Sequence, residues 1–127
     1  MEIYTSYFGK IHKLPSDIIP ISICGKAPDW YKGLQYKKIA PKKAFFMEWK
    51  ENHDNDFYTK CYNEQVLSSL NPHTVIMDLK HLCGISIYDD VKICLFCYEE
   101  PNKFCHRHLF TDWLKSNGYE CEELILD

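Results

Sequence analysis

The sequence predicts a single α/β domain, a sandwich with a short, mainly parallel sheet flanked by helices. The chain has 127 residues, which is the length of one ordinary domain of roughly 100–150 residues. Residues 91–97 are almost entirely apolar, as expected of a parallel strand buried on both faces. Strand-like and helix-like segments follow one another along the chain in an order typical of a sheet covered by helices. We therefore treat residues 1–127 as one domain.

Four segments are expected to form the strands. Residues 2–8 are rich in β-branched and aromatic side chains and end at Gly9, and residues 18–24 form a second short apolar segment. Residues 91–97 are predicted to be the central strand. Residues 119–126 alternate only weakly and suit an edge strand.

Helices are expected where apolar spacing and capping residues agree. Asp54 is a good N-cap for a helix running to residue 70. Asn71 and Pro72 begin a second helix, which ends near Gly84. The last helix covers residues 105–117, and a helix-like segment covers residues 42–51. The stretch 26–43 is expected to be a long irregular loop that carries lysines and aromatic residues, as binding loops often do.

Composition excludes several classes of protein. Hydrophobic residues make up 46% and charged residues 26%, which is globular composition rather than that of a disordered chain. The formal net charge of −3 gives no global argument for binding duplex DNA or an acidic membrane. No apolar run is long enough to span a bilayer, and residues 1–10 lack the apolar core of a secretory signal. A cytoplasmic protein with no membrane partner is expected.

The chain has seven cysteines, an odd number, and several lie within apolar runs. In a cytoplasmic protein they are expected to be mostly reduced and buried, with a disulfide scaffold as the alternative. A zinc site is not expected, because Cys94 and Cys97 lie three apart on a strand and point to opposite faces. A cysteine phosphatase is excluded by spacing, since nine residues separate Cys97 from Arg107. No metal and no cofactor are predicted.

The segment 97–108 is the richest in chemistry, because it joins the most buried strand to the start of the last helix. Ligands of open α/β sheets bind at this edge, and a helix N-terminus there favours anions. Arg107 is the candidate anion-binding group, although it is equally suited to capping a neighbouring carbonyl or pairing with Glu99 or Glu100. Cys105 is a candidate nucleophile, His106 a candidate acid or base, and Glu99 a candidate carboxylate.

Three motifs resemble the bacterial domain of unknown function 488 (DUF488) family. They are the opening strand at residues 3–9, the middle loop at residues 30–41, and the terminal pattern Cys97-Tyr98-Glu99 with Cys105-His106-Arg107. The resemblance implies a small cytosolic domain with a Rossmann-like sheet. It also implies a site near these residues: Thr5, Ser6, Tyr98, Glu99, Cys105, His106 and Arg107. Residues 25–28 depart from the Arg-Pro pattern of longer members, and Lys26 is the nearest substitute for that arginine.

Function remains a choice among three hypotheses. The first is a domain that binds a small phosphorylated, nucleotide-like molecule, with Ser6, Tyr7, Lys26 and Arg107 nearby and Trp30, Tyr31 or Tyr36 stacked on a base. The second is a hydrolase or transferase that acts on such a ligand through Cys105, His106 and the carboxylate of either Glu99 or Glu100. The third is a nucleic-acid or protein interaction module in phage–host conflict, which uses the lysine-rich loop; nucleic acid is the less favoured partner.

Overall fold

The computed structural model describes residues 1–86 and 89–127, and it has helices on both faces of a five-stranded parallel sheet. The strand order is β3-β2-β4-β1-β5, and every pair of neighbouring strands is parallel. The strands are β1 (Glu2–Tyr7), β2 (Ile18–Ser22), β3 (Leu34–Gln35), β4 (Lys92–Cys97) and β5 (Glu122–Glu123). This is a small Rossmann-like α/β fold, as predicted.

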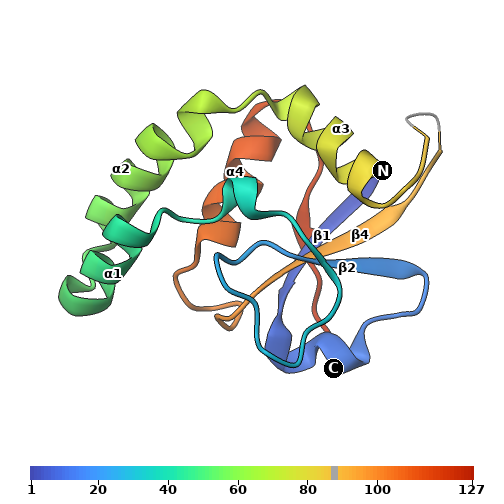
Figure 1. Cartoon of the computed structure of the whole chain (residues 1–127), viewed down its shortest axis with the longest axis horizontal. Coiled ribbons are helices and arrows are strands. Elements are labelled where there is room, and N and C mark those ends of the chain that lie inside the picture. The colour runs from blue at the N-terminus through green and yellow to red at the C-terminus, as the bar shows by residue number, and fades with distance from the viewer. Residues whose placement is uncertain (87–88) are drawn as a thin grey trace.

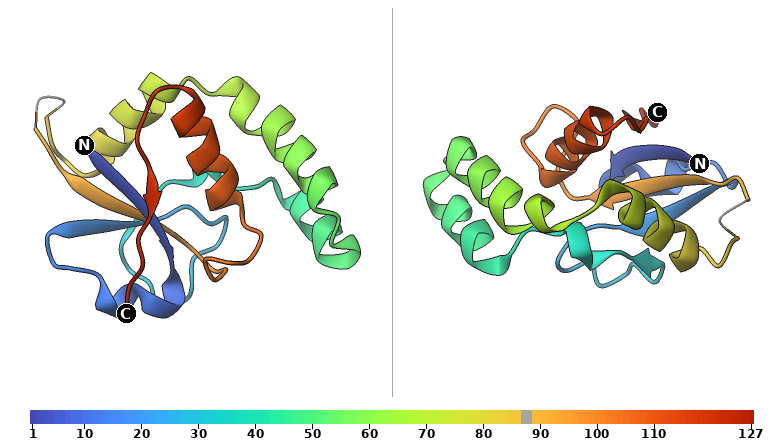
Figure 2. Two further views of the ribbon diagram at one scale, coloured as in Figure 1. Left: turned by 180° about the vertical axis from the view of Figure 1, so that it is seen from behind. Right: turned by 90° about the horizontal axis from the view of Figure 1, so that it is seen from above.

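The helices are α1 (Lys43–Asn52), α2 (Asn55–Gln65), α3 (Pro72–Leu82) and α4 (His106–Ser116), with short 3₁₀ turns η1 (Phe8–Lys13), η2 (Lys37–Ile39) and η3 (Leu67–Ser69). Helix α4 lies on one face of the sheet and α3 on the other (Figure 2). Helices α1 and α2 form a hairpin beside the sheet (Figure 1). No helix among the described residues is long and apolar enough to cross a membrane.

Capping residues fix the helix ends as expected. The Asp54 carboxylate accepts a hydrogen bond from the Phe57 amide, and the Asn71 side chain accepts one from the Thr74 amide. Gly84 and Gly118 follow α3 and α4 with φ of 72° and 87°. These are left-handed values that a glycine adopts without the clash a Cβ would cause.

Strand β4 is the centre of the core because it pairs with β1 on one side and β2 on the other. Its residues Ile93, Cys94, Leu95 and Phe96 are fully buried. The chain leaves the carboxyl end of β2 toward the β3 edge and leaves β4 toward the β5 edge. The two connections therefore diverge between the adjacent ends of β2 and β4, the place where open α/β sheets bind ligands.

Two local expectations were too simple. The stretch 26–43 is not wholly irregular, because it contains β3 and η2. The helix predicted over residues 54–70 is shorter in the structure, because α2 ends at Gln65 with Val66 as its C-cap and the 3₁₀ turn η3 follows. Val66 and Leu67 are both buried, so packing against the core directs the chain there.

Candidate functional site

A pocket of about 460 Å³ opens beside the carboxyl ends of β2 and β4, where the connections that follow the two strands diverge. The end of β2 contributes Cys24 and Lys26, and the end of β4 contributes Cys97, Tyr98 and Glu99. The start of α4 contributes Cys105 and His106 to the floor. Its volume is within the range that holds a small ligand, roughly 300–1,000 Å³.

Four aromatic rings line one side of the pocket, and we call them the aromatic wall: Phe46, Trp49, Tyr58 and Phe104. The Trp49 ring centroid lies 5.7 Å from that of Phe104 and 5.6 Å from that of Tyr58. Tyr58 and Phe104 pack edge to face at 5.0 Å. Because the rings support one another, the wall is a rigid apolar surface on which a planar group can stack.

Three exposed lysines also line the pocket: Lys26, Lys43 and Lys50. The Lys50 ammonium lies 5.1 Å above the Phe46 ring, so this charge is held beside the aromatic wall. Glu99 is the one acidic side chain among the lining residues that the structure describes. The pocket therefore combines an apolar wall with an excess of positive charge.

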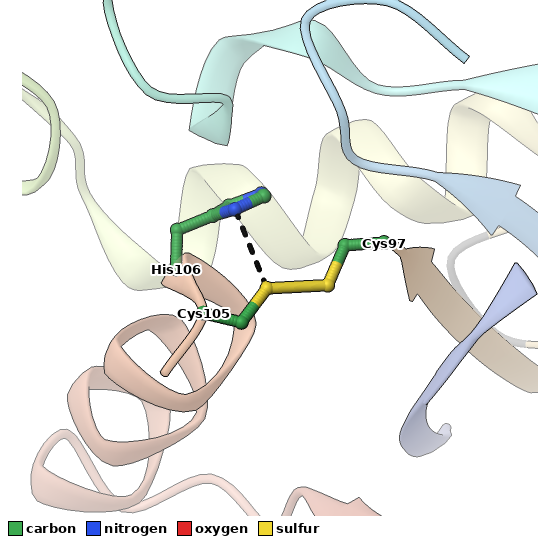
Figure 3. Close-up of side chains that lie close together, drawn as sticks. All are labelled: Cys97, Cys105 and His106. Carbon is green, nitrogen blue, oxygen red and sulfur yellow. Dashed lines mark hydrogen bonds between the residues drawn. A yellow bond between two sulfur atoms is a disulfide. The ribbon is translucent and has the colours of Figure 1, made fainter. Parts of the chain in front are cut away.

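Cys97 and Cys105 form a disulfide at the floor of the pocket, joining the end of β4 to the residue before α4 (Figure 3). The other five cysteines, Cys24, Cys61, Cys83, Cys94 and Cys121, are free, in line with mostly reduced thiols. Cys24 also lines the pocket, and burial raises the pKa of its thiol to about 12, so it stays protonated at neutral pH.

His106 is buried beside this disulfide and is uncharged at neutral pH. Its Nε2 lies 2.9 Å from the Ile23 carbonyl oxygen, and its Nδ1 lies 3.8 Å from the Cys105 sulfur. A carbonyl oxygen only accepts hydrogen bonds, so Nε2 carries the proton and Nδ1 presents a lone pair to Cys105. Burial, with a smaller effect of the neighbouring Arg107 charge, lowers the pKa of His106 to about 4.

Arg107, the next residue of α4, is completely buried and is not among the described residues that line the pocket. Its Nε and one terminal nitrogen each donate to an oxygen of Glu123, both at 3.0 Å. Its other terminal nitrogen donates to the Cys97 sulfur at 2.8 Å and to the Glu99 carbonyl oxygen at 2.7 Å. The guanidinium therefore caps the Glu99 carbonyl and contacts the disulfide, and its carboxylate partner is Glu123 rather than Glu99 or Glu100.

The three predicted site residues of β1, Thr5, Ser6 and Tyr7, lie outside the pocket lining. The Thr5 hydroxyl donates to Glu123 at 2.7 Å, so Thr5 belongs to the Arg107 side. Ser6 is buried, and its hydroxyl has no hydrogen-bond partner among the described residues. Tyr7 ends β1 and is half-buried. Among the described residues, the pocket is lined by neither Thr5, Ser6 nor Tyr7.

The aromatic residues of the loop at 26–43 lie elsewhere. Trp30 is 60% exposed and packs edge to face on Phe8. The Tyr31 hydroxyl donates to the Leu34 carbonyl oxygen, and the Tyr36 hydroxyl donates to Asp78. Tyr98 does line the pocket, and its hydroxyl donates to the Lys26 carbonyl oxygen at 2.6 Å. Tyr31 thus stabilises the loop itself, and Tyr36 joins the loop to α3.

The pocket residues of α1 and the ion-pair partner Glu123 were not predicted from the sequence. Lys43, Phe46 and Lys50 are three and four residues apart, which places them on one face of a helix. Their spacing within the helix-like segment 42–51 could therefore have predicted that these three side chains lie on one face of a helix. No sequence signal pointed to Glu123, because it lies on an edge strand far along the chain from Thr5.

The fold and the pocket define a small Rossmann-like domain with a ligand-sized cavity at the carboxyl edge of its sheet. A family model described as the active DUF488-N3 subclade, DUF488-N3a, matches residues 9–118. The chain therefore belongs to the DUF488 family, as its motifs indicated. Neither the curated proteins nor the solved structures contain a significant match to it.

Proposed function

We propose that the pocket binds a small phosphorylated molecule that carries a planar ring, as a nucleotide does. One observation carries the proposal: the aromatic wall and three lysines line the same cavity of about 460 Å³. A ring can stack on Trp49 or Phe46 while its phosphate is held by the lysine ammonium groups. The position at the carboxyl edge of the sheet and the start of α4 supports the same class of ligand.

Anion recognition is assigned first to Lys26, Lys43 and Lys50, because these charges are exposed at the pocket. Arg107, the residue predicted from sequence, has bonds to Glu123, Cys97 and Glu99 in this structure. A direct role for Arg107 remains a prediction. It is tested by Arg107→Lys, which keeps the charge but loses the planar donor geometry.

The experiment is a thermal-shift screen that separates the ring from the phosphate. The probes are AMP, adenosine, ribose 5-phosphate and inorganic phosphate. A ligand at one hundred times its Kd adds about 2.7 kcal/mol of stability, which raises the Tm by several degrees in a domain of this size. We expect AMP to give the largest shift. Equal shifts from AMP and inorganic phosphate would remove the stacking argument, and no shift from any probe would remove the proposal.

Two tryptophans provide a matched pair of variants. Trp49 lines the pocket and Trp30 is exposed outside it. Trp49→Leu should weaken AMP binding about tenfold, since stacking a base on an aromatic ring contributes roughly 1–3 kcal/mol. Trp30→Leu should leave the affinity unchanged. If Trp30→Leu weakens AMP binding and Trp49→Leu does not, the base stacks on the loop at 26–43 instead of on the aromatic wall.

A second candidate function is a hydrolase or transferase. Glu99, Cys105 and His106 all line the pocket, so the three residues predicted for catalysis face one cavity. In the reduced protein Cys105 would be the nucleophile and His106 the base that accepts its proton. Turnover of a phosphorylated substrate that survives both Cys105→Ala and Glu99→Gln would exclude this assignment. A cytoplasmic location is part of both proposals and is supported by the five free cysteines.

A further inference from the structure

We propose that Cys97 and Cys105 form a redox-active pair that exchanges thiols and disulfides with small, negatively charged thiol compounds entering through the pocket. This activity goes beyond ligand binding and does not depend on the phosphorylated ligand. Both sulfurs belong to residues that line the pocket, so an incoming thiol has a route to the bond. The contacts around the two sulfurs differ, and this difference gives the exchange a direction.

Cys97 is the sulfur that leaves as a thiolate. The Arg107 guanidinium donates to it at 2.8 Å and stabilises the negative charge that appears when the bond breaks. Glu123 holds that guanidinium in place through two hydrogen bonds of 3.0 Å. A thiol whose anion is stabilised is the better leaving group in thiol–disulfide exchange.

Cys105 is the sulfur that is attacked. Cys105 is 7% exposed and Cys97 is 1% exposed, so Cys105 is the more accessible of these two buried residues. The lone pair of His106 Nδ1 lies 3.8 Å from the Cys105 sulfur, where it can accept the proton of an incoming thiol. Burial and the start of α4 hold His106 in the required position (Figure 3).

The exchange proceeds in two balanced steps. The sulfur of a small thiol attacks Cys105, the bond between Cys105 and Cys97 breaks, and its electron pair leaves on Cys97 as a thiolate. A second small thiol attacks the outer sulfur of the mixed disulfide and releases Cys105 as a thiol. In sum, the protein disulfide and two thiols give the Cys105 thiol, the Cys97 thiolate, one small-molecule disulfide and one proton. Two electrons pass to the protein; one proton stays on Cys105, and the other passes to solvent.

The charge around the pocket selects the thiol. Lys26, Lys43 and Lys50 outnumber Glu99 among the lining side chains. A thiol that carries carboxylates is therefore concentrated at the entrance, and a cationic thiol is repelled. Glutathione and cysteamine are probes of opposite charge. At low salt, reduction of the disulfide by glutathione should be about tenfold faster than its reduction by cysteamine. The difference between the two rates should shrink at high salt, where charges are screened.

The first test uses the full chain in buffers of defined ratios of reduced to oxidised glutathione, followed by alkylation and intact-mass measurement. Cys97 and Cys105 should both become alkylated as the ratio of reduced to oxidised glutathione rises, and both should change over the same range of ratios. Oxidation by oxidised glutathione reverses the reduction, so the mixed disulfide forms on Cys105 and Cys97 resolves it. Cys97→Ser removes the resolving thiol and should accumulate glutathione on Cys105, about tenfold more than Cys105→Ser accumulates on Cys97. Cys61→Ser, which changes a half-buried cysteine outside the pocket, should behave as the parent protein.

A second measurement isolates the positioning role of Arg107. In the reduced protein, the ultraviolet absorbance of the thiolate follows the ionisation of Cys97 as the pH is raised. Arg107→Lys should move that ionisation to higher pH, and Arg107→Lys with Cys97→Ser should show no such transition. A purely structural role for Arg107 would lower stability without moving the ionisation.

Three results would overturn the proposal. The first is a folded protein in which Cys97 and Cys105 stay fully alkylatable in excess oxidised glutathione. The second is equal trapping of glutathione by the two serine variants. The third is stoichiometric zinc in the reduced protein that protects both thiols, because Cys97, Cys105 and His106 place their ligand atoms within 4.8 Å of one another.

Discussion

His106 and Arg107 are neighbours in the first turn of α4, yet they belong to two different regions. His106 faces the pocket, is neutral, and leaves one ring nitrogen with its lone pair toward Cys105. Arg107 faces β5, is charged, and bonds to Glu123, Cys97 and Glu99. The first region lines the candidate pocket, whereas the second joins the start of α4 to β5 and to the end of β4.

Cys97 lies between the two regions and belongs to both. Its sulfur bonds covalently to Cys105 on the pocket side and accepts a hydrogen bond from Arg107 on the other. Arg107 therefore links Glu123 to the Cys97 sulfur through hydrogen bonds of one guanidinium. The Arg107–Glu123 salt bridge is thus joined by one hydrogen bond to a sulfur of the candidate site.

The largest expected effect comes from breaking the Arg107 side. Glu123→Ala leaves the completely buried guanidinium without its carboxylate, which costs about 3–5 kcal/mol of stability when such a pair is broken. Urea denaturation measures the loss. The neighbouring Glu122 is exposed, so Glu122→Ala is the matched control and should change stability by less than about 0.5 kcal/mol. Equal effects of the two variants would contradict the assigned role of Glu123.

The next effect belongs to His106 and depends on pH. Its pKa is about 4 in the folded protein, against 6.5 as the ordinary value, so the unfolded chain binds the proton first as the pH falls. This contribution to stability is complete above about pH 6.5 and is lost progressively toward pH 4, by about 3 kcal/mol in all. Arg107 and His108 lie nearby, and both disfavour the charged imidazole.

Urea denaturation of the parent protein and of His106→Gln across this pH range isolates that contribution. Glutamine does not titrate, and its amide can donate to the Ile23 carbonyl as Nε2 does. The variant should lose less stability than the parent protein between pH 6.5 and 4. Parallel curves would show that His106 is not held neutral by burial.

A smaller effect is expected from a single lysine of the pocket. Lys43→Gln should weaken binding of AMP a few-fold at low salt, because one exposed charge contributes up to about 1 kcal/mol. Lys42 is the adjacent exposed lysine outside the pocket, so Lys42→Gln is the matched control. Titration calorimetry at low and high salt measures both. Similar losses in the two variants would indicate a general charge effect rather than a site.

The smallest effect is expected at Glu99, which lines the pocket, whereas Glu100 does not. Both side chains are exposed, so neither Glu99→Gln nor Glu100→Gln should change stability by more than about 0.5 kcal/mol. Glu99→Gln removes a negative charge beside the ligand and should strengthen AMP binding about two- to threefold. Glu100→Gln should have no effect on binding. An effect of Glu100 alone would reverse the assignment.

Local sequence patterns were sufficient for most of the fold. The apolar run at residues 91–97 predicted the central strand, and Asn71-Pro72 with Gly84 predicted both ends of α3. These signals are local because capping and burial on two faces leave their mark on adjacent residues. The two-residue β3 and the break at Val66 left no such mark, because pairing with β2 and packing against the core decide them.

The sequence by itself determined the α/β class, the family, the central strand and the start of α4 as the place of the candidate site. Tertiary structure alone decided which of His106 and Arg107 lines the pocket, that α1 adds two lysines and two aromatic rings to the lining, and that Glu123 pairs with Arg107. The reason is physical. Periodicity and capping act between residues a few positions apart, whereas the pocket and the ion pair join segments that meet only when the sheet orders its strands.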